Sequence, residues 1–81
     1  MAVSMPEEKK ANIEEIKRAA SIVGSPTRLA WALEVSYNTV YSWMNGKFAP
    51  DPINCLKIQK VTKGQVQARD ILPNYEWDKI L

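Results

Sequence analysis

Residues 25–46, SPTRLAWALEVSYNTVYSWMNG, decide the fold, because capping signals divide them into two short helices. Ser25 is a good N-cap, and Pro26 suits the first helical position, where its missing N–H costs nothing. Ser36 provides a second helix start, and Gly46 provides a left-handed stop. The stretch therefore predicts two helices joined by a tight turn, which is a helix-turn-helix.

Apolar residues give this motif one inner face. They recur at helical spacing in both predicted helices: Leu29, Ala30, Leu33, Val40, Trp43 and Met44. We expect Ala30 where the helices come closest, and Trp43 in the core rather than in a stacking role. Trp31 lies at the edge of the stripe, in a position to cover the first motif helix. The outer face of the second helix carries hydrogen-bonding groups and no like charges, as a probe of base edges in a major groove requires.

Candidate DNA contacts gather on the second motif helix and its N-cap: Ser36, Tyr37, Asn38, Thr39, Tyr41 and Ser42. Asn38 can pair in bidentate fashion with adenine, and the Thr39 methyl group can contact thymine. The serine and tyrosine hydroxyls can reach phosphates or base edges. For Tyr37 and Tyr41 the alternative to a DNA contact is partial packing against neighbouring helices. For Tyr41 the sequence favours neither interpretation.

Three further candidates flank this helix. Arg28 and Lys47 can reach phosphates on either side, which positions a protein without specifying sequence. Thr27 can donate to a phosphate beside the free N–H groups of its helix N-terminus, or it can act as a second N-cap. Basic residues concentrate after the motif, since residues 47–69 hold five Lys or Arg and one acidic residue. For Lys57, Lys60 and Lys63 we favour a solvated helix face.

The spacing of Ala30, Val35, Val40 and Trp43 resembles that of phage and bacterial helix-turn-helix repressors. The segment LAWALEVSYNTVYSWMNG is similar to the Cro-like repressors of lambdoid phages and to the related YdaS-type regulators. The following run, APDPINCLKIQKVTKGQVQARDILP, resembles the Pro-containing loop and Thr-x-Gly helix of that group. The resemblance implies a transcriptional regulator that occupies a double-stranded DNA operator. One departure is Glu34, where glycine is usual. It must accept a positive φ or shift the turn, at a cost of roughly 1 kcal/mol.

Size and composition exclude several other functions. The 81 residues hold no histidine and one cysteine, so neither a zinc site nor a Ser-His-Asp triad can form. No Gly-rich phosphate loop occurs, and the acidic residues near the N-terminus alternate with basic ones as on a solvated helix. We expect no enzyme activity, no cofactor, no metal and no small-molecule substrate. Without a long apolar run or a signal peptide, no membrane association is expected, and the single cysteine suits the reducing cytoplasm.

The remaining sequence predicts one all-α domain of four or five helices over residues 1–81. A first helix is expected from about Pro6 to Val23, buried through Ile13, Ile16, Ala19, Ala20 and Val23. A helix should follow Asp51-Pro52 and run to about Thr62, with inward-facing Ile53, Leu56 and Val61. Cys55 in that helix should be a small buried residue. The alternation at 65–67 predicts a short extended piece, followed by one or two helical turns at 68–72.

The tail, residues 73–81, is unusually apolar. Its side chains Tyr75, Trp77, Ile80 and Leu81 either dock on their own core, which we favour, or join a dimer interface. A homodimer is expected on functional grounds, because one reading helix covers few base pairs. The alternative function is that of an antitoxin or adaptor whose helix-turn-helix binds protein. Loss of operator discrimination in Asn38→Ala would support DNA binding, whereas loss of function in Trp77→Ala would support the protein-binding alternative.

Overall fold

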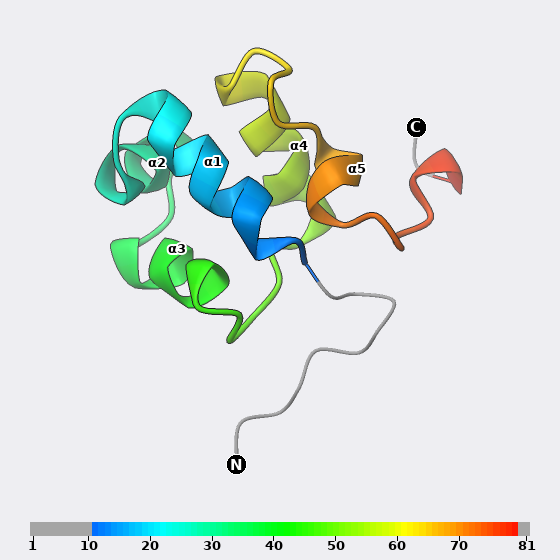
Figure 1. Ribbon diagram of the computed structural model, residues 1–81, viewed down its shortest axis with the longest axis horizontal. Helices are drawn as coiled ribbons and strands as arrows, with labels where there is room; N and C mark the ends of the chain where they lie inside the picture. Colours follow the sequence, from blue (N-terminus) through cyan, green and yellow to red (C-terminus); the bar gives the residue numbers. More distant parts are fainter. Residues whose placement is uncertain (1–10, 80–81) are drawn as a thin grey trace.

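The computed structural model describes residues 11–79, and this part of the chain is all helical. The helices are α1 (Ile13–Val23), α2 (Pro26–Leu33), α3 (Tyr37–Met44), α4 (Pro52–Val61), α5 (Ala68–Ile71) and a 3-10 turn, η2 (Trp77–Lys79). Figure 1 shows α1 between the α2–α3 pair and the α4–α5 pair. Helix α1 packs against α2, α3 and α5, while α4 packs against α2 and α5. The predicted all-α helix-turn-helix fold is thereby confirmed.

The first helix begins later than the sequence predicts. Ala11 and Asn12 are not helical, and α1 starts at Ile13. Ala11 is buried, and the backbone N–H of Asn12 donates to the Ile71 carbonyl oxygen at 2.7 Å. This bond ties the start of α1 to α5, so a tertiary contact sets the boundary. The rest of the predicted first helix, residues 6–10, lies outside the described residues.

Buried side chains from all five α-helices share one core. The largest fully buried ones come from every part of the fold: Ile16, Leu29, Leu33, Val40, Ile58, Val66 and Ile71. Within α1 the predicted stripe is buried at Ile16, Ala19 and Ala20 and half-buried at its two ends. Trp43 is also a core residue, as predicted.

Helix α4 presents a different face to the core from the one predicted. Ile53 is 60% exposed, whereas Cys55 and Ile58 are fully buried. Leu56 and Val61 are half-buried and pack against the core. Since residues three apart share a helix face, the burial of Cys55 and Ile58 turns Ile53 toward solvent. The prediction that Ile53 faces inward is wrong.

A buried threonine organises the turn after α4. The Thr62 hydroxyl donates to the Ile58 carbonyl oxygen at 2.8 Å and accepts from the Val66 N–H at 3.1 Å. Lys63 adopts φ 56°, and the Gly64 N–H donates to the Gln59 carbonyl oxygen, which ends the helix in a Schellman motif. Residues 65–67 form bends and no strand, although Val66 is fully buried. The predicted extended piece is therefore wrong.

The described part of the apolar tail docks on its own core. Trp77 is buried, and its indole N–H donates to the Leu72 carbonyl oxygen at 2.8 Å. The ring of Tyr75 packs against that of Trp77 with centroids 4.9 Å apart. Docking, the favoured alternative, is confirmed for these two residues. Ile80 and Leu81 lie outside the described residues.

Candidate nucleic-acid interface

The turn between α2 and α3 fixes the angle at which the second motif helix is presented. Glu34 adopts the left-handed conformation, with φ 61° and ψ 41°. The Val35 N–H donates to the Ala30 carbonyl oxygen at 3.0 Å, and the Glu34 N–H donates to the Trp31 carbonyl oxygen at 3.1 Å. These two bonds form a Schellman motif around Glu34. The turn is therefore built without shifting, and a non-glycine residue carries the positive φ.

The outer face of α3 carries three exposed side chains. Tyr37 and Tyr41 are 46% and 54% exposed, and their rings stack with centroids 5.9 Å apart and planes inclined by 23°. Tyr41 is thus not packed into the core. Asn38 is exposed, and its amide makes no hydrogen bond within residues 11–79. A free amide beside a ridge of two tyrosines can pair with a base edge without first breaking a bond in the protein.

The hydroxyl groups at the start of α3 are already engaged with each other. Ser36 Oγ accepts from the Thr39 backbone N–H at 3.1 Å and lies 2.9 Å from Thr39 Oγ1. Thr39 and Ser42 are both half-buried. Ser36 therefore acts first as the N-cap that begins the helix. A hydroxyl has one donor and two lone pairs, so Ser36 keeps capacity for one further partner.

The start of α2 presents a cation and a hydroxyl to solvent. Ser25 Oγ accepts from the Arg28 backbone N–H at 3.1 Å and thus caps the helix. Thr27 is exposed and makes no side-chain hydrogen bond within the described range, so it is not a second N-cap. The Arg28 side chain runs beside Gly24, where an added Cβ would lie 2.9 Å from Arg28 Cδ. Gly24, at φ 122°, leaves room for this side chain.

The chain leaves α3 through another Schellman turn. The Lys47 N–H donates to the Ser42 carbonyl oxygen at 2.9 Å, and Gly46 adopts φ 76°. A Cβ on Gly46 would lie 2.8 Å from Ile13 Cδ1, so a side chain there would also push the end of the Ile13 side chain aside. Lys47 is exposed, and its Nζ lies 5.9 Å from the centroid of the Phe48 ring. This turn places Lys47 just beyond the end of α3.

Two exposed aromatic residues were not among the predicted contacts. Phe48 is 57% exposed beside Lys47, and Trp31 is 73% exposed on α2. The signal for Phe48 was its place in a short loop after the Gly46 stop, where an apolar side chain has no helix face to bury. Trp31 was predicted at the edge of the apolar stripe, in a position to cover the first motif helix, but most of its surface is exposed.

Arg28 and Lys47 form no ion pair within the described residues. The ion pairs within residues 11–79 are Glu14–Lys17, Glu15–Arg18 and Glu76–Lys79, all on other elements. Arg28 and Lys47 therefore keep their charge free for a partner.

Beyond the motif, a shallow hollow of about 550 Å³ lies between the end of α2 and α4, and three unpaired lysines help to line it: Lys57, Lys60 and Lys63.

Cys55 has the properties of a core residue. Its side chain is fully buried, and Sγ lies 3.8 Å from the Pro50 carbonyl oxygen. Burial, aided by the nearby Asp51 carboxylate, raises the pKa of the thiol to about 12. A thiol in this state is a poor nucleophile. Within the described residues no group of three potential metal ligands occurs, and no helix there is long and apolar enough to cross a membrane.

The structure brings the predicted residues together in three places. Tyr37, Asn38 and Tyr41 share the outer face of α3, with Ser36, Thr39 and Ser42 closer to the helix body. Thr27 and Arg28 lie at the start of α2, which packs against α3, and Lys47 follows the end of α3. These features define the protein as a small all-helical helix-turn-helix domain whose second motif helix exposes a polar and aromatic face.

Comparison with known proteins gives the family. The family described as "Bacterial toxin YdaS" matches residues 16–80, and the chain belongs to it. A relative in Escherichia coli strain K12, described as "Putative transcriptional regulator YdaS", is 30% identical over 69 residues, which are 85% of this chain and 69% of the relative. No solved structure matches the chain. The predicted resemblance to YdaS-type regulators is therefore confirmed, while the predicted resemblance to Cro-like repressors remains a prediction.

Proposed function

We propose that this protein is a sequence-specific, double-stranded-DNA-binding transcriptional regulator that inserts α3 into the major groove. The observation that carries the proposal is the division of α3 into two faces. Val40 and Trp43 are buried, while Asn38 and the stacked tyrosines are exposed on a helix without a like-charged surface. The E. coli relative, described as a transcriptional regulator, supports the same role.

Each exposed group has a distinct part in this proposal. Asn38 reads adenine through its amide, and Tyr37 and Tyr41 contact phosphates or base edges. Arg28 and Lys47 hold the two ends of the motif against phosphates, with Thr27 beside the α2 N-terminus. Ser36, Thr39 and Ser42 support the reading helix and supply secondary contacts. The protein works without catalytic chemistry or a cofactor, in the cytoplasm, as a Cro-like repressor that excludes RNA polymerase or a competing repressor from an operator.

The test is selection of binding sites from a randomised duplex pool at near-physiological salt. We expect an enriched inverted repeat, read by two copies of the chain. Asn38→Ala should weaken binding to the selected site by roughly 5- to 150-fold, equivalent to about 1–3 kcal/mol, and relax the sequence preference. Asn12→Ala is the matched control, because Asn12 is also exposed and its side chain makes no cap bond. An unchanged preference in Asn38→Ala would refute the assigned role of Asn38.

Salt dependence separates phosphate contacts from base contacts. Arg28→Gln should weaken binding to all sequences about equally and reduce the salt slope by about one, because each phosphate contact releases about one counterion. A pool that stays random, with weak and salt-sensitive binding, would refute sequence-specific reading altogether.

A second candidate function is protein binding by the same domain, as in an antitoxin or adaptor. The specific observation in its favour is Trp31, a residue of α2 that is 73% exposed. Exposed tryptophans are typical of interface hot spots. Under this alternative Trp31→Ala would abolish binding to the protein partner, and the duplex pool would stay random.

A further inference from the structure

The outer face of α3 carries no charged side chain. The exposed residues of this helix are Tyr37, Asn38 and Tyr41, and no Lys, Arg, Asp or Glu occurs from residue 37 to residue 44. In the major groove, Arg and Lys pair with the O6 and N7 atoms of guanine, and Asp and Glu accept from the amino group of cytosine. Helix α3 therefore lacks the charged side chains that pair with either base of a G·C pair.

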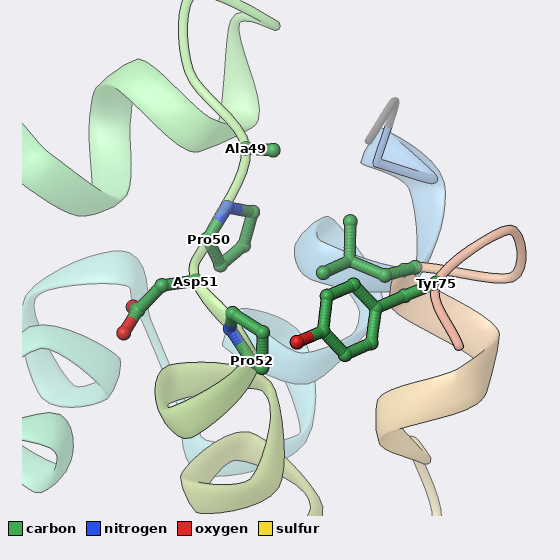
Figure 2. Close-up of a pocket in the computed structure, with 6 residues that line it drawn as sticks. Ala49, Pro50, Asp51, Pro52 and Tyr75 are labelled. Carbon is green, nitrogen blue, oxygen red and sulfur yellow. The ribbon is translucent and has the colours of Figure 1, made fainter. Parts of the chain in front are cut away.

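The two nearby cations lie outside this face. Arg28 stands at the start of α2, the motif helix that crosses the DNA backbone, and Lys47 follows the end of α3. Since the N-terminal part of the second motif helix contacts the base edges, both cations suit phosphates. Residues 48–52 contain no Lys or Arg, and Figure 2 shows the two prolines of this loop across a hollow from Tyr75. The surroundings of α3 thus supply no cation for guanine.

Of the two asparagines that border this face, Asn38 has the free amide. Asn45, after the end of α3, donates from Nδ2 to the Tyr41 carbonyl oxygen at 2.9 Å, which closes the end of the helix. The Asn38 amide forms no hydrogen bond within residues 11–79, so its oxygen and its nitrogen are both available. Such an amide pairs with adenine by donating to N7 and accepting from N6.

The stacked tyrosines present apolar ring surface beside this amide. Tyr37 and Tyr41 lie one helical turn apart, and Asn38 lies three residues before Tyr41, so the three side chains are neighbours on one face. The two rings are exposed, with centroids 5.9 Å apart. The apolar group that base pairs offer in the major groove is the C5-methyl group of thymine. The two rings can therefore remove thymine methyl groups from water, which favours thymine over cytosine.

We propose that α3, as the reading helix of the proposed function, recognises a core of adjacent A·T pairs. Asn38 pairs with adenine, and the rings of Tyr37 and Tyr41 cover thymine methyl groups. The centroid separation of 5.9 Å is less than two base steps of about 3.4 Å each, so the two rings lie over neighbouring pairs. The rings, and not the tyrosine hydroxyl groups, carry the discrimination.

Chemically substituted duplexes and the full chain provide the test. Binding-site selection should enrich half-sites in which A·T pairs occupy the positions where Asn38→Ala relaxes the preference. Deoxyuridine in place of a core thymine removes one methyl group and should weaken binding about fourfold per methyl group. In place of the core adenine, 7-deazaadenine removes the N7 acceptor and should weaken binding about fivefold or more. The 7-deazaadenine effect should be absent in Asn38→Ala.

Paired variants separate each tyrosine ring from its hydroxyl group. Tyr41→Phe keeps the ring, so the deoxyuridine effect at the thymine that Tyr41 covers should persist. Tyr41→Ala removes the ring, so that effect should disappear, and the same pair of changes at Tyr37 should act on a neighbouring thymine. Trp31→Ala, which removes an exposed ring from α2, is the matched control and should keep the full deoxyuridine effect. Circular dichroism should show all of these variants folded, because the altered side chains are exposed.

The outcomes separate failure of A·T recognition from failure of the proposed function. A core of G·C pairs, or equal binding to thymine and deoxyuridine duplexes, would overturn A·T recognition. In that case a sequence preference that depends on Asn38 would leave the proposed function standing. A deoxyuridine effect that survives both Tyr37→Ala and Tyr41→Ala, or that Tyr41→Phe already abolishes, would overturn the role of the rings. A duplex pool that stays random would refute both A·T recognition and the proposed function.

Discussion

Removal of the Trp77 side chain should destabilise the domain far more than removal of Trp31. Trp77 is 5% exposed and Trp31 is 73% exposed, so the two residues form a matched pair. Burial of a tryptophan removes about 200 Å² from water, which at about 25 cal/mol per Å² corresponds to roughly 5 kcal/mol as an upper bound. The lost hydrogen bond from the indole N–H to the Leu72 carbonyl oxygen adds to the effect. We expect Trp77→Ala to lower the free energy of unfolding by about 4 kcal/mol.

Urea unfolding followed by far-UV circular dichroism measures both variants. A domain of this length has a total stability of roughly 4–12 kcal/mol, so Trp77→Ala is expected to be marginally folded. Trp77→Phe keeps most of the ring and loses the N–H donor, and it should cost about 1–2 kcal/mol. Trp31→Ala should change the free energy of unfolding by less than about 0.5 kcal/mol. A cost for Trp77→Ala within 1 kcal/mol of that for Trp31→Ala, or one that depends on protein concentration, would refute docking of the tail on its own core.

Three further predictions concern the turn, a cap and the cysteine. Glu34→Gly should raise the free energy of unfolding by about 0.5–1 kcal/mol, because glycine accepts φ 61° without strain; a lower melting temperature would contradict this. Ser36→Ala should cost about 1 kcal/mol in urea unfolding through loss of the α3 cap, whereas Asn38→Ala should be nearly neutral; equal costs would show that Ser36 does not act as a cap. The pKa of Cys55 is raised from 9.0 to about 12 in the folded state, so the unfolded chain loses this proton first as pH rises. Stability should fall above pH 9, by at most about 1.4 kcal/mol per pH unit, and Cys55→Ala should lack this contribution; an identical pH dependence in both proteins would contradict the buried thiol.

The helix-turn-helix was accessible from the sequence because its signals are local. Ser25 and Ser36 cap their helices through backbone N–H groups only three residues away. Such bonds depend on neighbouring residues and not on the rest of the fold, so α2 and α3 begin where predicted. The conformation of Glu34 is also set locally, since the turn requires a positive φ whichever residue occupies this position.

The candidate interface could be predicted only in part from the sequence. Helical spacing identified the exposed face of α3, but not the ring stacking of Tyr37 and Tyr41 or the mutual engagement of Ser36 and Thr39. Both depend on which rotamer each side chain adopts. Phe48 was missed for a related reason, because loop residues have no periodicity from which exposure can be read.

Contacts between distant segments decided what the sequence left open. The sequence by itself determined the all-helical class, the two motif helices and their caps, because these follow from interactions within one turn of chain. Only the tertiary structure decided that α1 begins at Ile13, that Ile58 and not Ile53 faces the core, and that Trp77 docks beside Leu72. Each outcome depends on which apolar surfaces of separate elements bury one another. These surfaces lie far apart in the sequence and come into contact only when the whole chain packs.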